Sequence, residues 1–331
     1  MRLSEIALGT GDNAGGIIYG TSKEQIRLVE KALELGVNTF DCSPDYGKGL
    51  GEANLGRVLR EIGVPDAQII TKVEIMPEEV SAGIMRQKVR QSLEDSLLRL
   101  RREHVDIFML HNPVRMMRNP GVRVWMRLTP DDVLNEVMPV MEKLRSEGKV
   151  RFLGLACEAS ETCAVLPLLA TGAFAAINAW YNLANPTAAT SMRGFPPEED
   201  YQGLFEAAEK AGAGVAVIRP LAGGALTDRI LSGGSDARHP LSRGYFRDNP
   251  HLLEPELDRG RRFQFLAKEG RTLSHEAYRF VLSHPAVSTI VCGISEPGHL
   301  EEAARASDAG ALDRREMSEI AAVFQQGFFA N

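Results

Sequence analysis

The chain has 331 residues, of which 44% are hydrophobic and 25% are charged, and its formal net charge is −6. This composition is that of a globular protein, because disordered chains carry too few apolar residues to form a core. The negative net charge argues against a broad contact with the phosphate backbone of nucleic acids. The sequence contains no run of about 18 apolar residues, so no segment is expected to span a membrane.

The cysteines predict a protein of a reducing compartment. Neither metal-site spacing nor a dense disulfide framework links the four of them, Cys42, Cys157, Cys163 and Cys292. The chain also enters a strand-like segment close to Met1, without the apolar stretch of a signal peptide. We therefore expect a cytoplasmic protein with no metal centre. Cys42 and Cys157, which lie nearest the predicted site, are expected to be buried inert thiols.

Eight short β-rich segments alternate with helical segments from one end of the chain to the other. The strand-like segments cover residues 6–9, 37–41, 68–72, 105–110, 150–155, 174–178, 215–218 and 287–292. Most of them are nearly continuous apolar runs, which is typical of parallel strands that are covered on both faces.

Helical periodicity is clearest over residues 84–102, where apolar residues recur every three or four positions. The segments 24–35 and 131–146 show the same period. Gly36 and Gly148 follow two of these segments, at the position where a left-handed cap commonly ends a helix.

This alternation predicts an α/β fold in which right-handed crossovers join parallel strands. A closed (β/α)8 TIM barrel, which takes about 250 residues, fits the chain as a single domain over 1–331. The competing architecture is an open doubly wound sheet that begins on a G-x-G-x-x-G fingerprint. Gly9, Gly11 and Ala14 form only a variant of that fingerprint, and no helical pattern opens in the glycine-rich segment 15–20. We therefore favour the barrel.

Three long irregular segments follow strands, at residues 112–130, 183–200 and 221–254. They would lie at the C-terminal face of the barrel, where barrel enzymes hold their active sites. Ionisable residues at the ends of strands would lie at that same face.

Such residues end three of the predicted strands. Asp41, Lys72 and His111 each close an apolar strand, and Tyr46 follows Asp41 by five residues. A structural ion pair would explain Asp41 and Lys72, but four such residues at one barrel mouth favour a catalytic group. A nearby ammonium makes a phenol easier to deprotonate, and a neutral histidine can donate to a carbonyl oxygen. Together they would donate a proton to an oxygen that becomes negative when hydride reduces a carbonyl.

Four stretches of the chain resemble the aldo/keto reductase family. They are FDCSPDYG at 40–47 with GEANLGR at 51–57, QSLEDSLLRL at 91–100 leading to 105–111, EGKVRFLG at 147–154, and TIVCG at 289–293. The resemblance runs in order over nearly the whole chain and implies a (β/α)8 barrel that binds NADP(H) without a Rossmann domain. It implies that Tyr46 is the proton donor and that Lys72 lowers its pKa. It also implies that Asp41 pairs with Lys72 and that His111 orients the carbonyl.

The resemblance further implies a set of cofactor contacts at the strand ends. They are Gly9, Thr10, Asp41, Asn178, Ile218, Arg219, Pro220, Leu221, Gly223, Gly293, Ile294, Ser295, His299 and Glu302. Ala156 and Cys157 stand where the family usually holds the nicotinamide carboxamide with serine and asparagine, and Asn178 replaces the usual glutamine. Arg219 suits a pyrophosphate, because a guanidinium pairs bidentately with phosphate oxygens, or else an acidic loop residue. His299 is a weaker cation than arginine beside a 2′-phosphate, so NADP(H) is the first choice and NAD(H) the alternative.

The loop after His111 carries the substrate prediction. It contains Trp125 and four arginines, Arg115, Arg118, Arg123 and Arg127. They predict either a pocket for an anionic carbonyl compound, with Trp125 as an apolar wall, or a solvated or subunit-contact loop. Tyr46 and His111 would contact the reacting oxygen of the substrate.

We predict an NAD(P)H-dependent oxidoreductase that interconverts aldehydes, ketones or sugars with alcohols. One alternative is an NAD-linked sugar or alcohol dehydrogenase. Another, from a different class, is a cofactor-binding regulatory protein like the potassium-channel β-subunits that share the fold. The expected partner is a small-molecule substrate, with no nucleic acid and no membrane, and the sequence predicts no oligomeric state.

Overall fold

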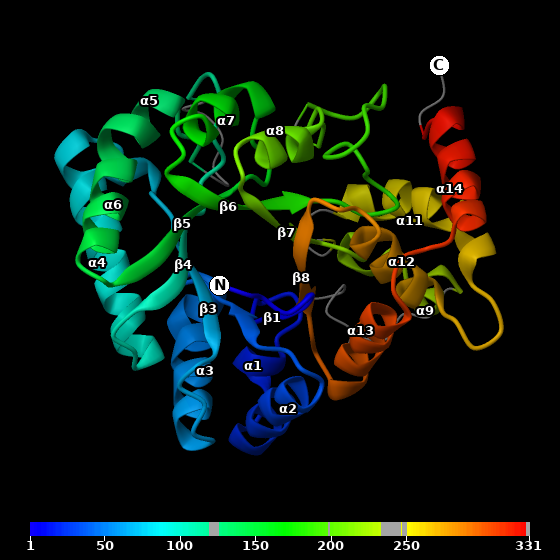
Figure 1. Ribbon diagram of the computed structural model, residues 1–331, viewed down its shortest axis with the longest axis horizontal. Helices are drawn as coiled ribbons and strands as arrows, with labels where there is room; N and C mark the ends of the chain where they lie inside the picture. Colours follow the sequence, from blue (N-terminus) through cyan, green and yellow to red (C-terminus); the bar gives the residue numbers. More distant parts are fainter. Residues whose placement is uncertain (119–125, 198, 233–245, 247–249, 329–331) are drawn as a thin grey trace.

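The computed structural model describes residues 1–118, 126–197, 199–232, 246 and 250–328. Eight parallel strands pair in chain order, and the barrel closes where β8 pairs with β1 (Figure 1). The strands are β1 Ile6–Gly9, β2 Thr39–Asp41, β3 Gln68–Val73, β4 Val105–Leu110, β5 Val150–Ala156, β6 Phe174–Trp180, β7 Gly214–Ile218 and β8 Val287–Gly293. The predicted (β/α)8 barrel is confirmed, and each strand end lies within two residues of its predicted position.

The pleat of the strands decides which side chains enter the barrel. Successive residues point alternately inward and outward. The inward positions of β3, β4 and β6 form a small apolar layer of Ile70, Ile107, Met109 and Ala176. Outward positions such as Phe108 belong to the large core between the barrel and the helices. Asp41 pairs in register with Ile70, while Lys72 and His111 follow Ile70 and Met109 by two residues, so all three point inward.

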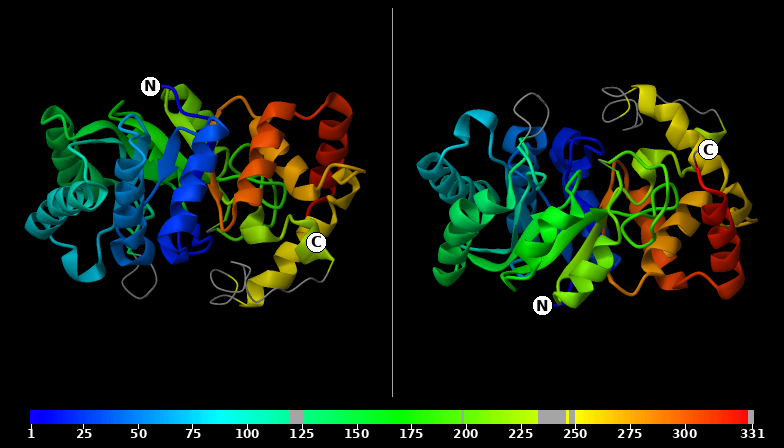
Figure 2. Two further views of the ribbon diagram at one scale, coloured as in Figure 1. Left: turned by 90° about the horizontal axis from the view of Figure 1, so that it is seen from below. Right: turned by 90° about the horizontal axis from the view of Figure 1, so that it is seen from above.

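Helices surround the barrel, and the last part of the chain adds a layer beyond β8 (Figures 1 and 2). The α-helices are α1 Gly16–Tyr19, α2 Ser22–Glu34, α3 Leu50–Glu61, α4 Ala82–Leu100, α5 Pro130–Asp132, α6 Met138–Ser146, α7 Thr162–Leu169, α8 Leu204–Lys210, α9 Asp228–Leu231, α11 Leu253–Arg261, α12 Leu273–Leu282, α13 Pro297–Ala309 and α14 Arg314–Gln326. The 3-10 turns are η1 Tyr46–Gly49, η2 Pro77–Glu79, η4 Ala222–Gly224, η6 Pro250–Leu252 and η7 Gln264–Leu266. Two of these turns, η4 and η6, lie together with α9 in the segment 221–254, which differs from the expectation that this segment is irregular.

The glycine-rich segment after β1 differs from the expectation that no helix opens there. It forms the one-turn helix α1, which begins after Gly15 in the left-handed conformation (φ 70°). A Cβ on Gly16 would lie 2.6 Å from the carbonyl oxygen of Ile294, so only glycine allows α1 to approach the end of β8 this closely. Burial of Ile17 and Ile18 then stabilises a turn that periodicity alone does not predict.

The helix expected over 131–146 is interrupted by a π-helical turn, η3 Val133–Val137. The cause is Pro139, which lacks an N–H and whose ring would clash with the carbonyl four residues earlier. That carbonyl, of Asn135, instead accepts a hydrogen bond from Arg86 at 3.1 Å. The wider turn therefore accommodates the proline, and Arg86 supplies the hydrogen bond that Pro139 cannot donate.

Gly56 marks the closest approach of α3 to α4. A Cβ at this position would lie 2.5 Å from the carbonyl carbon and oxygen of Leu100, and backbone atoms cannot rotate away. We expect Gly56→Ala to destabilise the fold by about 1–3 kcal/mol through overpacking, although alanine favours helix. Thermal unfolding followed by circular dichroism measures the effect. The control is Gly83→Ala in the first turn of α4, where a Cβ meets nothing within 4 Å; equal melting temperatures for the two variants would contradict the prediction.

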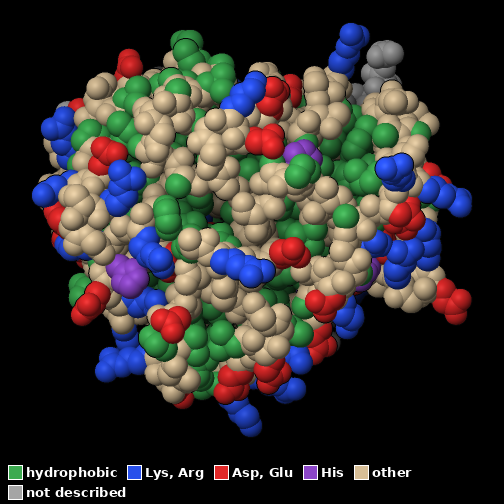
Figure 3. All heavy atoms as spheres, in the orientation of Figure 1, with side chains coloured by type: hydrophobic (Ala, Val, Ile, Leu, Met, Phe, Trp, Pro, Cys, Tyr) green, Lys and Arg blue, Asp and Glu red, His purple; other side chains and the backbone are tan. Residues whose placement is uncertain are grey.

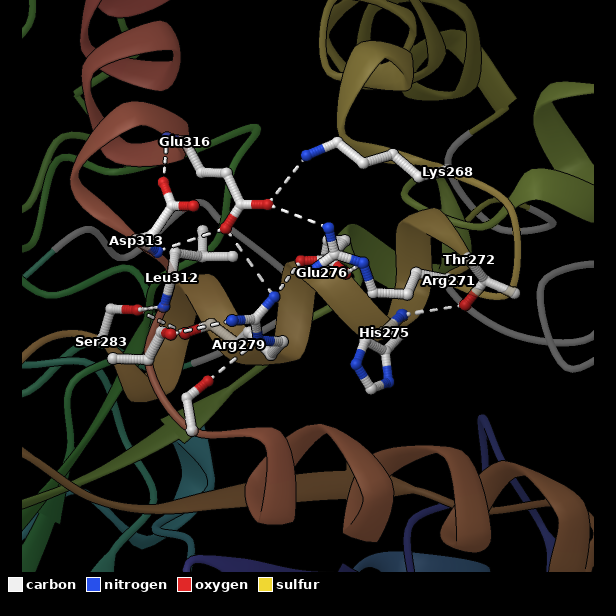
Figure 4. A network of polar contacts seen from close by, with 12 residues as sticks. Lys268, Arg271, Thr272, His275, Glu276, Arg279, Ser283, Leu312, Asp313 and Glu316 are labelled. Carbon is white, nitrogen blue, oxygen red and sulfur yellow. Dashed lines mark hydrogen bonds and ion pairs between the residues drawn. The ribbon is translucent and has the colours of Figure 1, made fainter.

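A buried ion-pair network fastens the C-terminal helix α14 to α12 (Figure 4). Glu316, which is 3% exposed, accepts hydrogen bonds from Lys268 at 2.9 Å and Arg271 at 3.1 Å. Arg279 pairs with Glu276 at 2.7 Å and lies 3.8 Å from Glu316. Although burial acts the other way, the hydrogen bond from Lys268 helps to lower the pKa of Glu316 to about 2. These side chains form ion pairs with one another, which indicates a structural role.

On the face seen in Figure 3, basic and acidic side chains are interspersed over the helices. This pattern differs from the continuous basic surface that phosphate backbones attract. Among the described residues, no helix combines the length and the apolar composition that a membrane crossing needs.

Candidate active site

Asp41, Lys72 and Tyr46 form a polar cluster at the carboxyl ends of β2 and β3. The Lys72 ammonium donates to Asp41 Oδ1 at 2.7 Å and to the carbonyl oxygen of Cys42 at 2.8 Å. Its Nζ lies 3.3 Å from the Tyr46 hydroxyl oxygen and 4.8 Å from the centroid of the Tyr46 ring. The side chains of Lys72 and Asp41 are 1% and 3% exposed. The structure thus brings three of the four predicted catalytic residues into direct contact, with Lys72 and Asp41 buried and Tyr46 partly buried.

Burial and charge together set the protonation state of this cluster. Burial raises the pKa of Tyr46 above its usual value, and the Lys72 ammonium offsets only part of that rise. Lys72 therefore contributes the expected lowering of the Tyr46 pKa, and burial, which is the larger effect, makes the net change a rise. Burial also opposes the charge on Lys72, yet Asp41 and Tyr46 outweigh it, and the pKa of Lys72 is raised. At neutral pH the phenol keeps its proton and the ammonium keeps its charge.

The turn that carries Tyr46 is held by a carboxylate from the loop after β1. Tyr46 opens η1, and the next three residues, Gly47, Lys48 and Gly49, adopt left-handed conformations with φ of 58°, 54° and 87°. The Gly47 N–H donates to both carboxylate oxygens of Asp12, at 2.9 and 3.1 Å. Asp12 therefore ties the first strand to the turn and limits the movement of Tyr46.

His111 follows β4 and lies beside Tyr46. The two rings meet edge to face, with 6.1 Å between their centroids. His111 Nδ1 lies 3.4 Å from Oδ2 of Asp45, the residue before Tyr46. Burial lowers the pKa of His111, the Lys72 charge acts in the same direction, and Asp45 opposes both. The imidazole is therefore neutral at neutral pH.

A second carboxyl group lies behind Asp45. Glu74, the residue after β3, shares a hydrogen bond with Asp45, and burial together with the Asp45 charge raises the pKa of Glu74 to about 7. In the described part of the chain, Asp45, Glu74 and His111 bring polar atoms within 4.8 Å of one another. Hydrogen bonding among the three explains this closeness, and we assign no metal to them.

Three buried oxygen atoms at the barrel mouth have no hydrogen-bond partner among the residues that the structure describes. They are Thr10 Oγ1, Asp41 Oδ2 and Asn178 Oδ1, at the carboxyl ends of β1, β2 and β6. A buried polar atom without a partner costs about 1–3 kcal/mol. Three of them at one mouth indicate a ligand that supplies hydrogen-bond donors there.

The predicted cofactor-binding residues that follow β7 lie at this same end of the barrel. The strand ends at Ile218, and Arg219, Pro220 and Leu221 lead into η4, which contains Gly223. Arg219 donates to both carboxylate oxygens of Glu256 on α11, at 3.0 and 3.3 Å. Its guanidinium also lies 4.2 Å from the centroid of the Trp180 ring. Arg219 therefore pairs with an acidic residue here, which is one of its two predicted roles.

The predicted contacts after β8 surround the start of α13. β1 and β8 end on the paired residues Gly9 and Gly293, and Ile294 follows. Ser295 Oγ lies 3.1 Å from His299 Nδ1, and a carboxylate oxygen of Glu296 lies 3.1 Å from His299 Nε2. Glu302 accepts a hydrogen bond from Ser274 at 2.9 Å, so its carboxylate contacts the start of α12. His299 thus lies between a hydroxyl group and a carboxylate.

The arginine-rich loop after His111 gives little support to an anion pocket. Arg115 pairs with Glu161 at 2.8 Å, and Arg118 pairs with Asp132. Both guanidinium groups are thus committed to neighbouring carboxylates. Trp125 and Arg123 lie outside the described residues.

At the end of β5 lie Ala156 and Cys157, which stand where the family usually has serine and asparagine. Ala156 and Cys157 are buried, and burial raises the pKa of the Cys157 thiol to about 12, as expected for an inert thiol. Glu158 follows them. Burial raises its pKa to about 7, while Arg219, a hydrogen bond with Trp180 and Lys72 act in the opposite direction.

The sequence profile of the Aldo/keto reductase family matches residues 5–325. The chain belongs to the aldo/keto reductase family. This aldo/keto reductase is 25% identical over 329 residues to the L-galactose dehydrogenase of Arabidopsis thaliana, covering 96% of this chain and 90% of that protein. It is 27% identical over 334 residues to the L-glyceraldehyde 3-phosphate reductase of Escherichia coli K12, with coverages of 97% and 88%. The solved glycerol dehydrogenase of Gluconobacter oxydans has the same fold, with a TM-score of 0.71, 23% identity and coverages of 98% and 92%.

As an aldo/keto reductase, the protein is an NAD(P)H-dependent oxidoreductase that interconverts carbonyl compounds and alcohols. The residues at the mouth fit a nicotinamide dinucleotide, because the unpaired oxygens of Thr10, Asp41 and Asn178 can accept from its amide and hydroxyl groups. Ala156 and Cys157, both buried, would offer such a cofactor apolar surface instead of hydrogen bonds.

Sequence reasoning missed four acidic residues of this aldo/keto reductase: Asp12, Asp45, Glu74 and Glu158. Two of them could have been found, because Glu74 directly follows β3 and Glu158 follows the end of β5 by two residues. Asp12 and Asp45 lie in loops whose conformation no periodic pattern predicts.

Proposed function

We propose that Tyr46 is the proton donor of this aldo/keto reductase, with Lys72 and Asp41 supporting it and His111 contacting the reacting oxygen. The observation that carries the proposal is the buried contact of Lys72 with both Asp41, at 2.7 Å, and the Tyr46 hydroxyl, at 3.3 Å. The phenol is protonated at neutral pH and can give its proton to an oxygen that becomes negative. The phenolate that remains is stabilised by the adjacent ammonium.

Other residues of the chain position Lys72, Tyr46 and the reacting oxygen. Asp41 holds the Lys72 ammonium in place, and the Asp12 carboxylate holds the turn that carries Tyr46. His111 lies edge to face with the Tyr46 ring and is close enough to orient the same oxygen. When bound, the nicotinamide supplies the hydride for carbonyl reduction or accepts it from an alcohol.

The cofactor we propose is NADP(H). The fourteen residues that the family resemblance implies, of which Gly9 is the first and Glu302 the last, would hold it. Ser295 and His299 would meet the 2′-phosphate at the start of α13. Glu296 competes for the same imidazole, at 3.1 Å, and its charge favours a ribose hydroxyl over a phosphate. This carboxylate is the observation that keeps NAD(H), and with it an NAD-linked dehydrogenase, as the second candidate.

Titration of the purified protein with NADPH and NADH in separate calorimetry experiments tests the cofactor proposal. We expect NADPH to bind more tightly, and we expect Glu296→Gln to increase that preference by removing a negative charge beside the phosphate. The control is Glu301→Gln on the same helix, where the carboxylate pairs with Lys31 at 3.1 Å. Equal affinities or tighter NADH binding would move the assignment to the dehydrogenase, and binding of neither would contradict the enzyme proposal.

A regulatory protein of the same fold would bind NADPH tightly and turn over many carbonyls only slowly, while holding a stable protein partner. The complete Asp41–Lys72–Tyr46–His111 group supports the enzyme instead, since a sensor has no need of a proton donor. We also infer a reducing compartment such as the cytoplasm, which the four free cysteines support.

A further inference from the structure

We propose that Glu52, in the first turn of α3, is a positioning residue that holds the Tyr46 hydroxyl beside Lys72. Its carboxylate does so by joining the end of β3 and the helix α4 to the turn that carries Tyr46. The inference rests on the proposed function, in which Tyr46 donates the proton and Lys72 stabilises the phenolate.

Both oxygens of the Glu52 carboxylate accept hydrogen bonds inside the protein. The side chain is 0% exposed, and Oε1 accepts from Thr71 Oγ1 at 2.5 Å. Oε2 accepts from Arg99 Nε at 2.7 Å, and the same arginine donates to Ser96 Oγ at 3.2 Å. Hydrogen bonds to a charged group are stronger than neutral ones, and a buried charge that loses its partner is strongly destabilising. Glu52 is therefore held at one position between β3 and α4.

The hydrogen bond to Thr71 fixes the part of β3 that carries Lys72. Thr71 is buried and directly precedes Lys72 in the strand. Side chains of successive strand residues point to opposite faces, so Lys72 points into the barrel while Thr71 points outward, toward α3. A hydrogen bond that holds Thr71 from outside the barrel therefore also fixes the backbone from which Lys72 extends.

The start of α3 is in close contact with the turn that carries Tyr46. The turn η1 continues directly into α3, and Glu52 is the third residue of that helix. A Cβ on Gly51 would lie 3.3 Å from the Cβ of Tyr46, so the backbone of α3 packs against the tyrosine itself. A Cβ on Gly49 (φ 87°) would lie 2.9 Å from Cδ of Arg99, so this arginine packs over the last residue of η1. A shift of the Glu52 carboxylate would therefore shift the tyrosine as well.

Asp12 and Glu52 hold this turn from different sides. The Asp12 carboxylate binds the Gly47 N–H from the loop after β1, whereas Glu52 joins the turn to β3. Together they set the distance of 3.3 Å between Lys72 Nζ and the Tyr46 hydroxyl oxygen. A misplacement of about 1 Å at a reacting group can lower a rate by on the order of 10²-fold. Loss of the Glu52 hydrogen bonds should therefore reduce turnover without removing any group that contacts the substrate.

The kinetic test compares Thr71→Val with Thr71→Ser in the reduction of DL-glyceraldehyde by NADPH. Valine has the shape of threonine but lacks the hydroxyl group that binds Glu52, whereas serine keeps it. In Thr71→Val we expect kcat to fall about 10–100-fold and the KM for glyceraldehyde to stay unchanged. In Thr71→Ser we expect kcat to stay close to that of the unsubstituted protein. A purely structural hydrogen bond predicts instead that both folded variants keep their kcat, whatever their melting temperatures.

Carbon NMR of the full chain labelled with ¹³Cζ-tyrosine reports on the contact itself, and Tyr46→Phe identifies the signal. We expect the Tyr46 signal to move in Thr71→Val, because the Lys72 ammonium then lies farther from the hydroxyl group, and to keep its position in Thr71→Ser. An unchanged Tyr46 signal in Thr71→Val would overturn the proposal, as would an unchanged kcat in an enzyme that depends on Tyr46, or an equal fall of kcat in both variants. A signal that moves in Thr71→Val alone, in a protein that keeps its turnover after Tyr46→Phe, would contradict the proposed function and leave the position set by Glu52 supported.

Substitution of Glu52 tests the other side of the same hydrogen bond. Glu52→Gln keeps an acceptor for Arg99 and supplies a donor to the Thr71 hydroxyl, so it should keep most of the kcat, whereas Glu52→Leu should lose it as Thr71→Val does. The control is Glu61→Gln at the end of the same helix, whose carboxylate pairs with Arg57 at 2.9 Å; it should keep both the kcat and the Tyr46 signal. If Thr71→Val does not fold, equal kcat values and equal Tyr46 signals in Glu52→Gln and Glu52→Leu would overturn the proposal.

Discussion

Replacing Tyr46 by phenylalanine is expected to lower the rate of carbonyl reduction by about 10²–10⁴-fold while leaving cofactor affinity unchanged. The substitution removes only the hydroxyl group that faces Lys72 at 3.3 Å. Lys72 keeps its hydrogen bonds to Asp41 and to the Cys42 carbonyl, so the buried charges remain paired. Single-turnover reduction measures the rate, and calorimetry with NADPH measures the binding.

The control for Tyr46→Phe is Tyr181→Phe, which removes a phenol hydroxyl from a packed site. The Tyr181 ring stacks on Phe280, with 5.0 Å between centroids, and lies against Phe205. This variant should retain turnover. If Tyr46→Phe also retained it, the proton would have to come from another group, and the role assigned to Tyr46 would be wrong.

The barrel could be predicted from the sequence because its signal is periodic. Apolar strand-like segments of four to six residues recur between helical segments, and a closed parallel barrel is the arrangement that covers both faces of every strand. The same periodicity places Asp41, Lys72 and His111 inward, since strand side chains alternate with a period of two. The contact of Lys72 with Asp41 thus follows from the order of the strands and the pleat of each one.

The features that the sequence could not predict depend either on the balance between burial and nearby charges or on the conformation of a loop. The direction of the pKa change at Tyr46 is one case, because the Lys72 charge is visible in the sequence but the larger effect of burial is not. Arg219 is another, since its pairing with Glu256 depends on where α11 lies after a long loop. The contact between Asp45 and His111 likewise depends on the turn that follows β2.

Removing the Lys72 charge should affect both stability and activity. Lys72→Met leaves the Asp41 carboxylate buried without its cation, and such a loss destabilises a fold by about 3–5 kcal/mol. Turnover should fall at least as far as in Tyr46→Phe, because the phenolate loses the charge that stabilises it. Urea unfolding measures the first effect and single-turnover reduction the second.

The double variant Asp41→Asn with Lys72→Met separates the two effects. Replacing both members of a buried ion pair removes the uncompensated charge, so most of the lost stability should return. Turnover should not return, since the folded protein still lacks the ammonium beside Tyr46. Recovery of turnover together with stability would show that Lys72 serves only to neutralise Asp41, and the cluster would then be a structural ion pair next to an independent proton donor.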